Sequence, residues 1–482
     1  MIRQVHCIAF ACAMAIFADS REAAAERPNI VLIVADDMRP DAVAALGKSA
    51  IRTPSLDQLV RRGTSFINAT CAYPICVVSR AEILTGCTGF RALTPPLSGK
   101  LDESLPTWPA TMRAAGYHTY YVGKWHTTGT PHDRGYEATA GWYGADSGTL
   151  PLTNPVDHHG RPVTGYTGWV FKDDAGRSLP EHGVGLTPNI SERFAHSAIE
   201  LIERKHGDHP FFLHVNFTAP HDPRFYPRGF QQAYDAAKLP LPKSFAAMHP
   251  FDHGNLNGRD EVLLPRPLTP DIVRQELAVY YSLIEHMDAQ IGRIVSVLER
   301  RGLSENTLVI FTSDHGMAVG SHGLAGKQNM YEHTIRVPLI VSGPGIARDQ
   351  RSTSLCYLRD LFPTICDRCD VPKPEGLDGQ SFADVLTDPK LAGPHRYLYG
   401  YFTNTQRMIR DRRWKYVRYP ATEREQLFDL AADPDELKNL AGDEQYRTTV
   451  ADLRSRMEAW FRAGRPALCR RETRRLNEPL NP

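Results

Sequence analysis

The sequence predicts an α/β fold in which a large, mostly parallel β-sheet is flanked by helices and followed by a smaller C-terminal α+β unit. Short apolar runs alternate with amphipathic stretches, which is typical of a parallel sheet covered by helices. After Pro394, apolar and polar residues alternate in the manner of strands. The 482 residues are 42% hydrophobic and 23% charged, which is enough apolar material for a large core and a second, smaller domain.

Four apolar runs are predicted to be strands of the main sheet, and polar residues follow each of them. The runs are Ile30–Ala35, Tyr117–Val122, Phe211–Phe217 and Leu308–Thr312. The polar residues that follow them are, in order, Asp36 and Asp37, Lys124 and His126, His221, and Asp314 and His315. Because parallel strands end at one edge of an open sheet, where ligands bind, we expect these side chains to form a site.

A long helix is predicted between Thr269 and Gly302. Thr269 can cap it, Pro270 suits its first turn, and Gly302 follows its end. Eight apolar residues keep helical spacing and predict one core-facing stripe. They are Val273, Leu277, Tyr280, Ile284, Met287, Ile291, Ile294 and Leu298.

The C-terminal part is expected to be a separate unit. The Pro- and Gly-rich stretch Val371–Pro394 marks the passage to it, which divides the chain into residues 26–375 and 376–482. Strands are predicted at Tyr397–Phe402, Met408–Ile409 and Trp414–Tyr419, and a terminal helix near Ala451–Phe461. The arginines that follow are interpreted as a solvated tail. They are Arg470, Arg471, Arg474 and Arg475.

Residues 1–25 are expected to be a signal peptide and the protein to be exported. Arg3 supplies a positive charge, Val5 to Ala18 is almost wholly apolar, and Ala23–Ala25 offers a small-residue cleavage site. The apolar run is shorter than the roughly 20 residues of a membrane span, so no stable span is predicted. The alternatives are an uncleaved anchor and a lipid-modified Cys12.

Charge and cysteine usage exclude two function classes. Lys and Arg number 56 against 55 Asp and Glu, a net charge of +1, so the basic excess of a nucleic-acid binder is missing. Cys366 and Cys369 have CxxC spacing, but no second pair or paired His follows, which argues against zinc. A local disulfide and buried thiols both remain open. Removal of the leader leaves an odd number of cysteines, and Cys76 is the candidate for the unpaired one.

The strand-end acids predict a site for a divalent cation. Asp36, Asp37, Asp314 and His315 form an oxygen-dominated set, which suits Ca²⁺ first and Mg²⁺ second. Each Asp pair alone is weak evidence, because Asp is also a common turn former. Several carboxylates at one edge are costly without a cation, and this strengthens the prediction.

The segment Tyr73–Gly86 (YPICVVSRAEILTG) predicts a helix that starts near Cys76 and carries Arg80 one turn on. Free N–H groups at a helix start favour a tetrahedral oxyanion. By itself, Cys76 could also be a small buried hydrophobic residue.

These motifs together resemble the type I sulfatases. Cys76-Val-Val-Ser79-Arg80 followed by Leu84-Thr85-Gly86 is similar to the family signature CxPSR and LTG. Further matches, in the family's order, cover nearly the whole mature chain. They are PNIVLIVADD, Gly123–His126, Pro220-His221, Ser313–Gly316, Lys327 and LFDLAADPDELKNL. The resemblance implies an alkaline phosphatase-like fold and hydrolysis of sulfate esters.

The resemblance also implies roles for residues of this chain. A maturation enzyme would oxidise Cys76 to formylglycine, whose hydrate is the nucleophile and, with Asp36, Asp37, Asp314 and His315, a metal ligand. Lys124 and Lys327 would bind the sulfate oxygens, and Arg80 would hold the hydrate. His221 would protonate the leaving alcohol, and His126 would take the proton that expels sulfate. His132, His253 and Arg259 could line the pocket, although ordinary loop positions are favoured.

The sequence departs from the family at Val78, where Pro is usual and Ala is sometimes found. The maturation enzyme reads this position, so efficient conversion of Cys76 is in question. Two other functions remain. One is a phosphate- or phosphonate-ester hydrolase of the same superfamily, because both anions are tetrahedral, and the other is an inactive relative that has lost maturation through Val78 and binds sulfated glycans. The segment PFDHGNLNGRDE is similar to that of bacterial polysaccharide sulfatases, which favours a sulfated small-molecule sugar or oligosaccharide as substrate.

Overall fold

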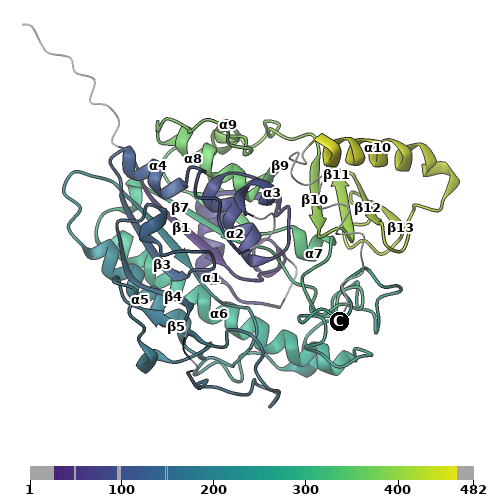
Figure 1. Ribbon diagram of the computed structural model, residues 1–482, viewed down its shortest axis with the longest axis horizontal. Helices are drawn as coiled ribbons and strands as arrows, with labels where there is room; N and C mark the ends of the chain where they lie inside the picture. The colour runs from purple at the N-terminus through teal and green to yellow at the C-terminus, as the bar shows by residue number, and fades with distance from the viewer. Residues whose placement is uncertain (1–26, 48–49, 95–98, 147, 149, 464–482) are drawn as a thin grey trace, which may run out of the picture.

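The computed structural model describes residues 27–47, 50–94, 99–146, 148 and 150–463 (Figure 1). The predicted signal peptide, residues 1–25, and the arginine cluster of residues 470–475 lie outside the described residues. Within the described part of the chain, no helix combines the length and the apolar character that a bilayer crossing requires.

A nine-stranded, mostly parallel sheet forms the centre of the larger unit. Its strands lie in the order β5-β4-β3-β6-β1-β7-β8-β2-β9, and β5 and β8 run antiparallel to their neighbours. Their bounds in this order are Trp169–Lys172, Ala138–Ala145, His118–Lys124, Phe211–Asn216, Asn29–Ala35, Thr307–Ser313, Leu339–Ser342, Gly63–Thr70 and Gln350–Tyr357. The four predicted strands are confirmed as β3, β6, β1 and β7. They are parallel neighbours at the centre, so their carboxyl ends lie side by side.

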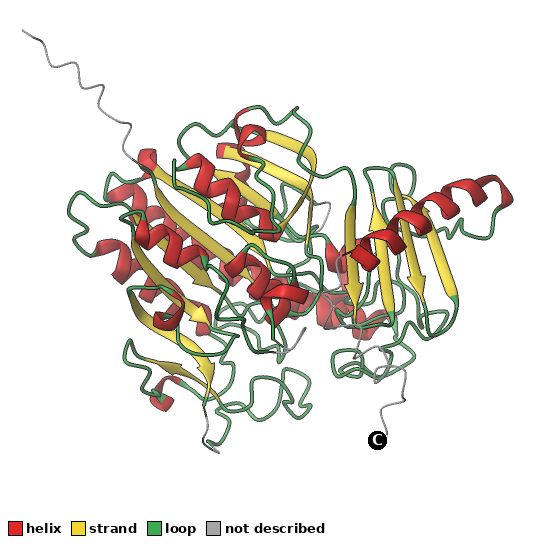
Figure 2. Ribbon diagram, turned by 45° about the horizontal axis from the view of Figure 1, so that its top comes forward, coloured by secondary structure: helices red, strands yellow, loops and turns green. Residues whose placement is uncertain are grey.

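Both faces of this sheet are covered by helices (Figures 1 and 2). Along β1, Ile30, Leu32 and Val34 pack into one hydrophobic core and Val31, Ile33 and Ala35 into the other. This explains why β1 reads as a continuous apolar run. Three helices contribute to the first core: α2 (Cys76–Thr85), α4 (Trp108–Ala114) and α8 (Leu361–Arg368). Three others contribute to the second core: α1 (Pro54–Arg62), α5 (Ile190–Glu203) and α6 (Pro270–Arg300).

The long helix α6 confirms the prediction from its capping residues. Thr269 accepts a hydrogen bond from the backbone N–H of Ile272 at 3.3 Å, and Pro270 is the first helical residue. All eight residues of the predicted stripe are at most 1% exposed. This burial fixes α6 against the sheet, with Tyr280 donating to the backbone oxygen of Asp37 at 2.7 Å.

The smaller C-terminal unit is a four-stranded antiparallel sheet with one helix against it (Figure 2). Its strands β10, β11, β12 and β13 span Leu398–Phe402, Gln406–Arg410, Trp414–Tyr419 and Arg424–Asp429, and α10 spans Arg447–Ala463. The three predicted strands are confirmed, and α10 begins four residues earlier than the predicted helix, 447 against 451. The remaining short helices α3, α7 and α9 span Gly89–Ala92, Glu332–Ile335 and Ala383–Thr387.

Buried charges join this sheet to the larger unit. Lys415 of β12 is fully buried and contacts Glu332 of α7 at 3.1 Å and Glu436 at 2.7 Å. The backbone N–H of Tyr401 also donates to the oxygen of Ala72 at 3.0 Å, just before the helix that carries Cys76. The C-terminal sheet therefore supports the segment that leads to α2.

The described cysteines are all free and buried. Cys366 and Cys369, for which a disulfide and buried thiols were both open, are buried thiols in α8 and at its end. Burial raises the pKa of Cys366 to about 12, so this thiol stays protonated and unreactive.

Candidate active site

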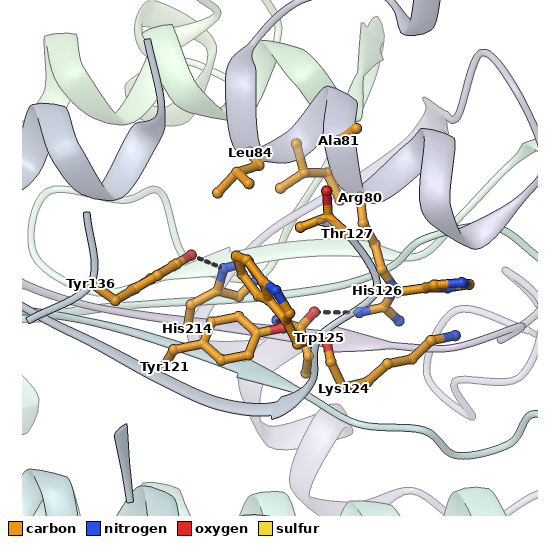
Figure 3. A pocket seen from close by; sticks show the side chains of 12 residues that line it. Arg80, Ala81, Leu84, Tyr121, Lys124, Trp125, His126, Thr127, Tyr136 and His214 are labelled. Carbon is orange, nitrogen blue, oxygen red and sulfur yellow. Dashed lines mark hydrogen bonds between the residues drawn. The ribbon is translucent and has the colours of Figure 1, made fainter. Parts of the chain in front are cut away.

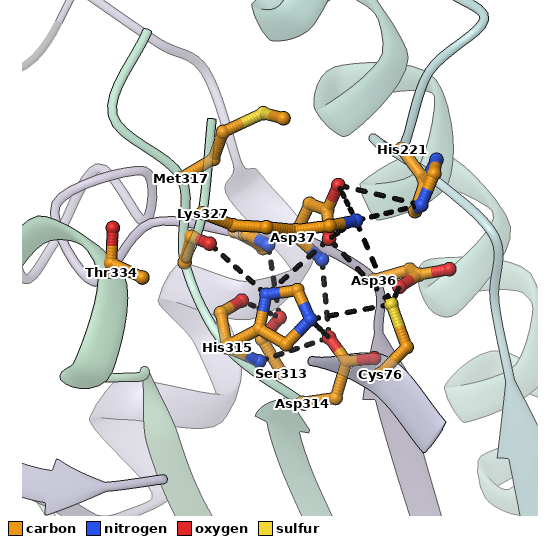
Figure 4. A network of polar contacts seen from close by, with 12 residues as sticks. Asp36, Asp37, Cys76, His221, Ser313, Asp314, His315, Met317, Lys327 and Thr334 are labelled. Atoms are coloured by element: carbon orange, nitrogen blue, oxygen red, sulfur yellow. Dashed lines mark hydrogen bonds and ion pairs between the residues drawn. The ribbon is translucent and has the colours of Figure 1, made fainter. Parts of the chain in front are cut away.

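The predicted site residues meet at the carboxyl edge of the sheet because their strands are neighbours (Figure 4). Asp36 and Asp37 follow β1, and Asp314 and His315 follow β7. Lys124 is the last residue of β3, and His221 lies in the loop after β6. Lys327 reaches the same point from the loop between β7 and α7. The side chains at the four strand ends therefore lie together at this edge, as the strand order requires.

Cys76 lies at the first turn of α2, in the middle of this group. Its Sγ is 3.2 Å from Asp36 Oδ1, 3.3 Å from His315 Nε2 and 3.7 Å from Lys327 Nζ. The residue is only 3% exposed. Burial opposes ionisation of the thiol, but the positive charges of Lys124 and Lys327 outweigh it and hold the pKa of Cys76 well below its usual range. Position 76 is thus surrounded by groups that stabilise a negatively charged nucleophile.

Four side chains could hold one metal ion. Ligand atoms of Asp36, Asp37, Cys76 and His315 all lie within 4.8 Å of one another. Two carboxylates, one imidazole and an oxygen at position 76 would make a mainly hard donor set, which fits Ca²⁺ or Mg²⁺ better than zinc. The residues present therefore fit the predicted cation.

Asp314 lies beside this group and is held by other contacts. Its Oδ2 accepts from Arg80 Nε at 2.9 Å, and its Oδ1 accepts from the N–H groups of Asp37 at 3.2 Å and His315 at 2.9 Å. Oδ1 is 3.8 Å from His315 Nε2. Burial and the negative charge of Asp36 raise the pKa of Asp314 to about 7. Asp314 is paired with Arg80 and is not among the four side chains whose ligand atoms lie within 4.8 Å of one another, so its place among the metal ligands stays a prediction.

The two lysines place fixed positive charge on either side of residue 76. Lys124 Nζ makes a short contact with Asp36 Oδ2, and Lys327 Nζ is 3.0 Å from both carboxylate oxygens of Asp37. Burial lowers the pKa of Lys327, but the charge of Asp37 more than offsets this, so that it stays well above its usual range. Two buried ammonium groups beside a helix start can bind the oxygens of a tetrahedral anion.

Arg80 is anchored from three sides. Besides Asp314, its Nη1 makes a short hydrogen bond to Asn216 Oδ1, and its Nη2 is 3.6 Å from Asp36 Oδ1. Asn216 in turn donates to Tyr121 Oη at 2.9 Å. The structure therefore places the Arg80 guanidinium against the carboxylates around residue 76, in a fixed orientation.

The two histidines lie on different sides of the nucleophile. His221 Nε2 is 2.8 Å from Lys327 Nζ and 3.8 Å from Asp37 Oδ2. His126 is half-buried and meets the Trp169 ring edge-on at 5.3 Å; burial lowers its pKa, although the neighbouring Cys76 opposes the shift. A neutral His126 beside residue 76 can accept a proton.

A small internal pocket lies behind these groups, between α2 and the ends of β3 and β6 (Figure 3). Arg80, Lys124 and His126 line it together with apolar residues of α2. His214, on its floor, shares a 2.7 Å hydrogen bond with Tyr136, and burial lowers its pKa to about 3. Cys76 is not among the residues that line this pocket.

Two residues of the site were missed by the sequence reasoning. Tyr166 donates from its hydroxyl to Asp36 Oδ2 at 2.6 Å, and its ring meets His221 edge-on at 4.9 Å. It lies in an irregular loop with φ at +57°, and no pattern marks it. Asn216 is the last residue of β6, so the strand-end argument that selected Asp36 could have found it.

Of the three loop residues considered as pocket lining, two make ordinary structural contacts. His253 is 1% exposed and its Nδ1 is 3.0 Å from Gln406 Nε2. His132 contacts the backbone oxygen of Tyr136 at 3.1 Å. Arg259 differs, because it binds Asp222, the residue next to His221.

Comparisons with known families match nearly the whole chain. The Sulfatase family profile covers residues 28–371, and the profile described as N-sulphoglucosamine sulphohydrolase, C-terminal, covers residues 320–462. An arylsulfatase of Clostridium perfringens is 28% identical over 464 residues, which cover 89% of this chain and 93% of the relative. A choline-sulfatase of Rhizobium meliloti is 30% identical over 486 residues, with coverage of 92% and 90%.

Solved structures share the fold. A structure described as a complex with its substrate D-glucosamine-2-N,6-O-disulfate has a TM-score of 0.74 at 22% identity and covers 90% of this chain and 97% of its own. The phosphonate monoester hydrolase of Agrobacterium radiobacter has a TM-score of 0.68 at 25% identity, with coverage of 91% and 96%. The mostly parallel sheet and the C-terminal antiparallel sheet are thus a shared architecture.

Proposed function

The chain belongs to the sulfatase family and is a sulfuric ester hydrolase, and from this premise we propose that it is an exported enzyme that removes sulfate from carbohydrates. Its nucleophile would be a formylglycine hydrate formed from Cys76, and its cofactor one divalent cation, Ca²⁺ before Mg²⁺. The observation that carries the proposal is the position of residue 76, at a helix start and within 3.7 Å of a carboxylate, an imidazole and an ammonium group.

The cation would be held by Asp36, Asp37, Asp314, His315 and the oxygen at position 76. When bound, it would supply positive charge that lowers the pKa of the attacking hydroxyl and balances the sulfate. The donor chemistry of these residues supports this assignment.

The side chains around residue 76 divide the remaining work. Lys124 and Lys327 would bind sulfate oxygens, where charge accumulates in the transition state. His221 would give a proton to the leaving alcohol through Nε2, the ring nitrogen that faces Lys327 and Asp37. His126 would then take the proton of the second hydroxyl at residue 76, so that sulfate leaves and the aldehyde returns.

Sulfated carbohydrate is the substrate class that the comparisons favour. One structural neighbour was solved with a disulfated glucosamine substrate, another is described as a 2-O GAG sulfatase, and the C-terminal profile is that of N-sulphoglucosamine sulphohydrolases. The test is a desulfation screen over defined sulfated mono- and oligosaccharides. Release of sulfate from aryl sulfates only would contradict the carbohydrate assignment.

Phosphonate- and phosphate-ester hydrolysis is the second candidate. Two structural neighbours are phosphonate monoester hydrolases, one of them 25% identical to this chain. Both anions are tetrahedral and would meet the same lysines. Parallel assays with nitrophenyl sulfate, nitrophenyl phosphate and a phenylphosphonate monoester separate the two, and a higher kcat/KM for sulfate is expected.

A further inference from the structure

Asp222 contacts the side of His221 that faces away from the nucleophile. His221 Nδ1 is 2.5 Å from the backbone oxygen of Asp222 and 3.3 Å from its Oδ1. Both partners are acceptors, so Nδ1 carries a hydrogen and Nε2 is left to exchange a proton with a substrate. Asp222 therefore sets both the orientation and the tautomer of the His221 ring.

Arg259 fixes the Asp222 carboxylate in turn. Its two terminal nitrogens donate to the two oxygens of Asp222, Nη1 to Oδ1 at 3.3 Å and Nη2 to Oδ2 through a short contact. The Asp222 side chain is 7% exposed and that of Arg259 is 37% exposed. A two-point contact of this kind restricts rotation of the carboxylate, which a single contact would not do.

The same network of polar contacts continues to the loop that carries Lys327. Arg259 Nη1 also donates to Asp260 Oδ1 at 2.6 Å, and Asp260 Oδ2 accepts from Gln328 Nε2 at 2.6 Å. Gln328 follows Lys327 in the chain. One row of polar contacts thus supports the loop of His221 and the loop of Lys327.

Space for the guanidinium depends on a glycine. A Cβ at Gly165 would lie 2.3 Å from Arg259 Nη2 and 3.3 Å from Asp222 Oδ2. The backbone before Tyr166 therefore packs directly against the Arg259–Asp222 pair. This close approach limits the positions that Arg259 can take.

We propose that Asp222 is a positioning residue that holds His221 for proton transfer to the leaving alcohol, and that Arg259 fixes Asp222 for this purpose. The proposal rests on the proposed role of His221 as general acid. In that step the hydroxyl of residue 76 loses its proton to solvent and its oxygen bonds to sulfur, while the bond from sulfur to the alcohol oxygen breaks. The electron pair of the broken bond stays on that oxygen, which receives the proton of His221 Nε2.

The test compares two leaving groups in a double-mutant cycle. The kcat/KM of the wild type, Asp222→Asn, His221→Ala and the double variant is measured with a sugar sulfate and with nitrophenyl sulfate. Asp222→Asn should lower kcat/KM about 10- to 100-fold for the sugar sulfate, within the range for loss of general acid catalysis. For nitrophenyl sulfate, whose alcohol leaves without a proton, the loss should stay under about 3-fold. In the His221→Ala background, Asp222→Asn should leave kcat/KM unchanged for both substrates.

Asp429→Asn is the matched control. Asp429 is also an aspartate bound by one arginine, Arg413 at 2.8 Å, and its side chain is 11% exposed. It lies in the C-terminal sheet, so its variant should leave both kcat/KM values unchanged. Arg259→Lys is the second variant if Asp222→Asn fails to fold, because it keeps the charge and loses the two-point contact. Arg259→Lys should also lower kcat/KM selectively for the sugar sulfate, but by a smaller factor than Asp222→Asn.

Four results would overturn the proposal. An equal loss on both substrates, or a further loss in the His221→Ala background, would show that Asp222 only supports the loop. His221→Ala could lower kcat/KM mainly for the sugar sulfate while neither Asp222→Asn nor Arg259→Lys does so. In that case the general-acid assignment stands and only the proposal for Asp222 fails. If His221→Ala affects both substrates equally, the general-acid assignment fails and the proposal fails with it.

Discussion

Tyr166 donates a hydrogen bond from its hydroxyl to Asp36 Oδ2 at 2.6 Å, and this contact is buried. Asp36 belongs to the group that could hold the cation. A hydrogen bond to a ligating carboxylate orients it, and loss of such a contact typically lowers metal affinity about 10- to 100-fold. Tyr166 keeps this position in a left-handed backbone conformation that non-glycine residues rarely adopt. Its strained conformation supports a role at the site.

Tyr166→Phe should therefore weaken binding of the cation by about 10- to 100-fold, because Asp36 loses the contact that orients it. The measurement is a calorimetric titration of metal-depleted enzyme with Ca²⁺. Tyr143→Phe is the matched control, since Tyr143 is also buried, its ring is 6.0 Å from that of Tyr166, and its hydroxyl has no hydrogen-bond partner among the described residues. Equal affinities for Tyr166→Phe and the wild type would contradict the prediction.

Tyr166 also marks the limit of what the sequence could predict. Asp36, Asp314 and Lys124 were found because each ends or follows a strand, and strand order brought them together. Continuous apolar runs predicted those strands, helical spacing predicted α6, and alternation predicted most of the C-terminal sheet. Tyr166 and Arg259 lie in loops, whose paths depend on long-range contacts that leave no periodic signal. The strands β2, β8 and β9 at one side of the sheet were not predicted either.

Removal of the cation should abolish sulfate release, because the buried carboxylates around residue 76 would lose the charge that balances them. Dialysis against a chelator is expected to lower kcat/KM at least about 100-fold, and Ca²⁺ should restore it more fully than Mg²⁺. Asp314→Ala should show the same loss without recovery, since it also removes the anchor of Arg80 at 2.9 Å. Full activity of the chelated enzyme would rule out a metal cofactor.

Lys415→Met should destabilise the protein strongly, because it leaves Glu436 buried without its cation, whereas Glu332 keeps its ion pair with Arg410. Breaking a buried ion pair by removing one partner typically costs about 3–5 kcal/mol. The loss is measured as the change in the free energy of unfolding in urea. Lys243→Met is the control, because the pair of Lys243 with Asp435 is exposed and such pairs contribute less than about 1 kcal/mol. Similar losses in the free energy of unfolding for both variants would show that the buried ion pairs of Lys415 do not stabilise the protein more than an exposed pair does.

His126→Ala should stop the reaction after the first half. His126 lies two residues after Lys124, the last residue of β3, and its pKa responds to the charge of Cys76, so its imidazole is the base we assign to this step. Without a base there, expulsion of sulfate is slowed, so sulfate should stay bound to residue 76. Mass spectrometry of the intact variant after incubation with nitrophenyl sulfate should detect the added sulfate, together with one equivalent of nitrophenol. Steady turnover at the wild-type rate would remove this role.

Conversion of Cys76 to formylglycine despite Val78 is the prediction on which turnover depends. A thiolate at residue 76 could attack sulfur, but it has no second hydroxyl through which to expel sulfate, so a cysteine form should turn over at most once. Val78 is the third residue of α2 and is 1% exposed, and Cys76 is 3% exposed, so we expect conversion to occur before the chain folds.

The measurement is mass spectrometry of the tryptic peptide Gly63–Arg80 from protein made in its native host. Cys71 in the same peptide provides an internal control, because it is a free cysteine outside the family signature and should remain alkylatable after unfolding. Val78→Pro tests the departure from the family signature in a heterologous host. Proline is tolerated in the first turn of a helix, so the variant should fold and should raise aldehyde occupancy and activity in proportion. Unmodified cysteine in the native protein, together with no turnover, would favour a sulfated-glycan-binding role instead.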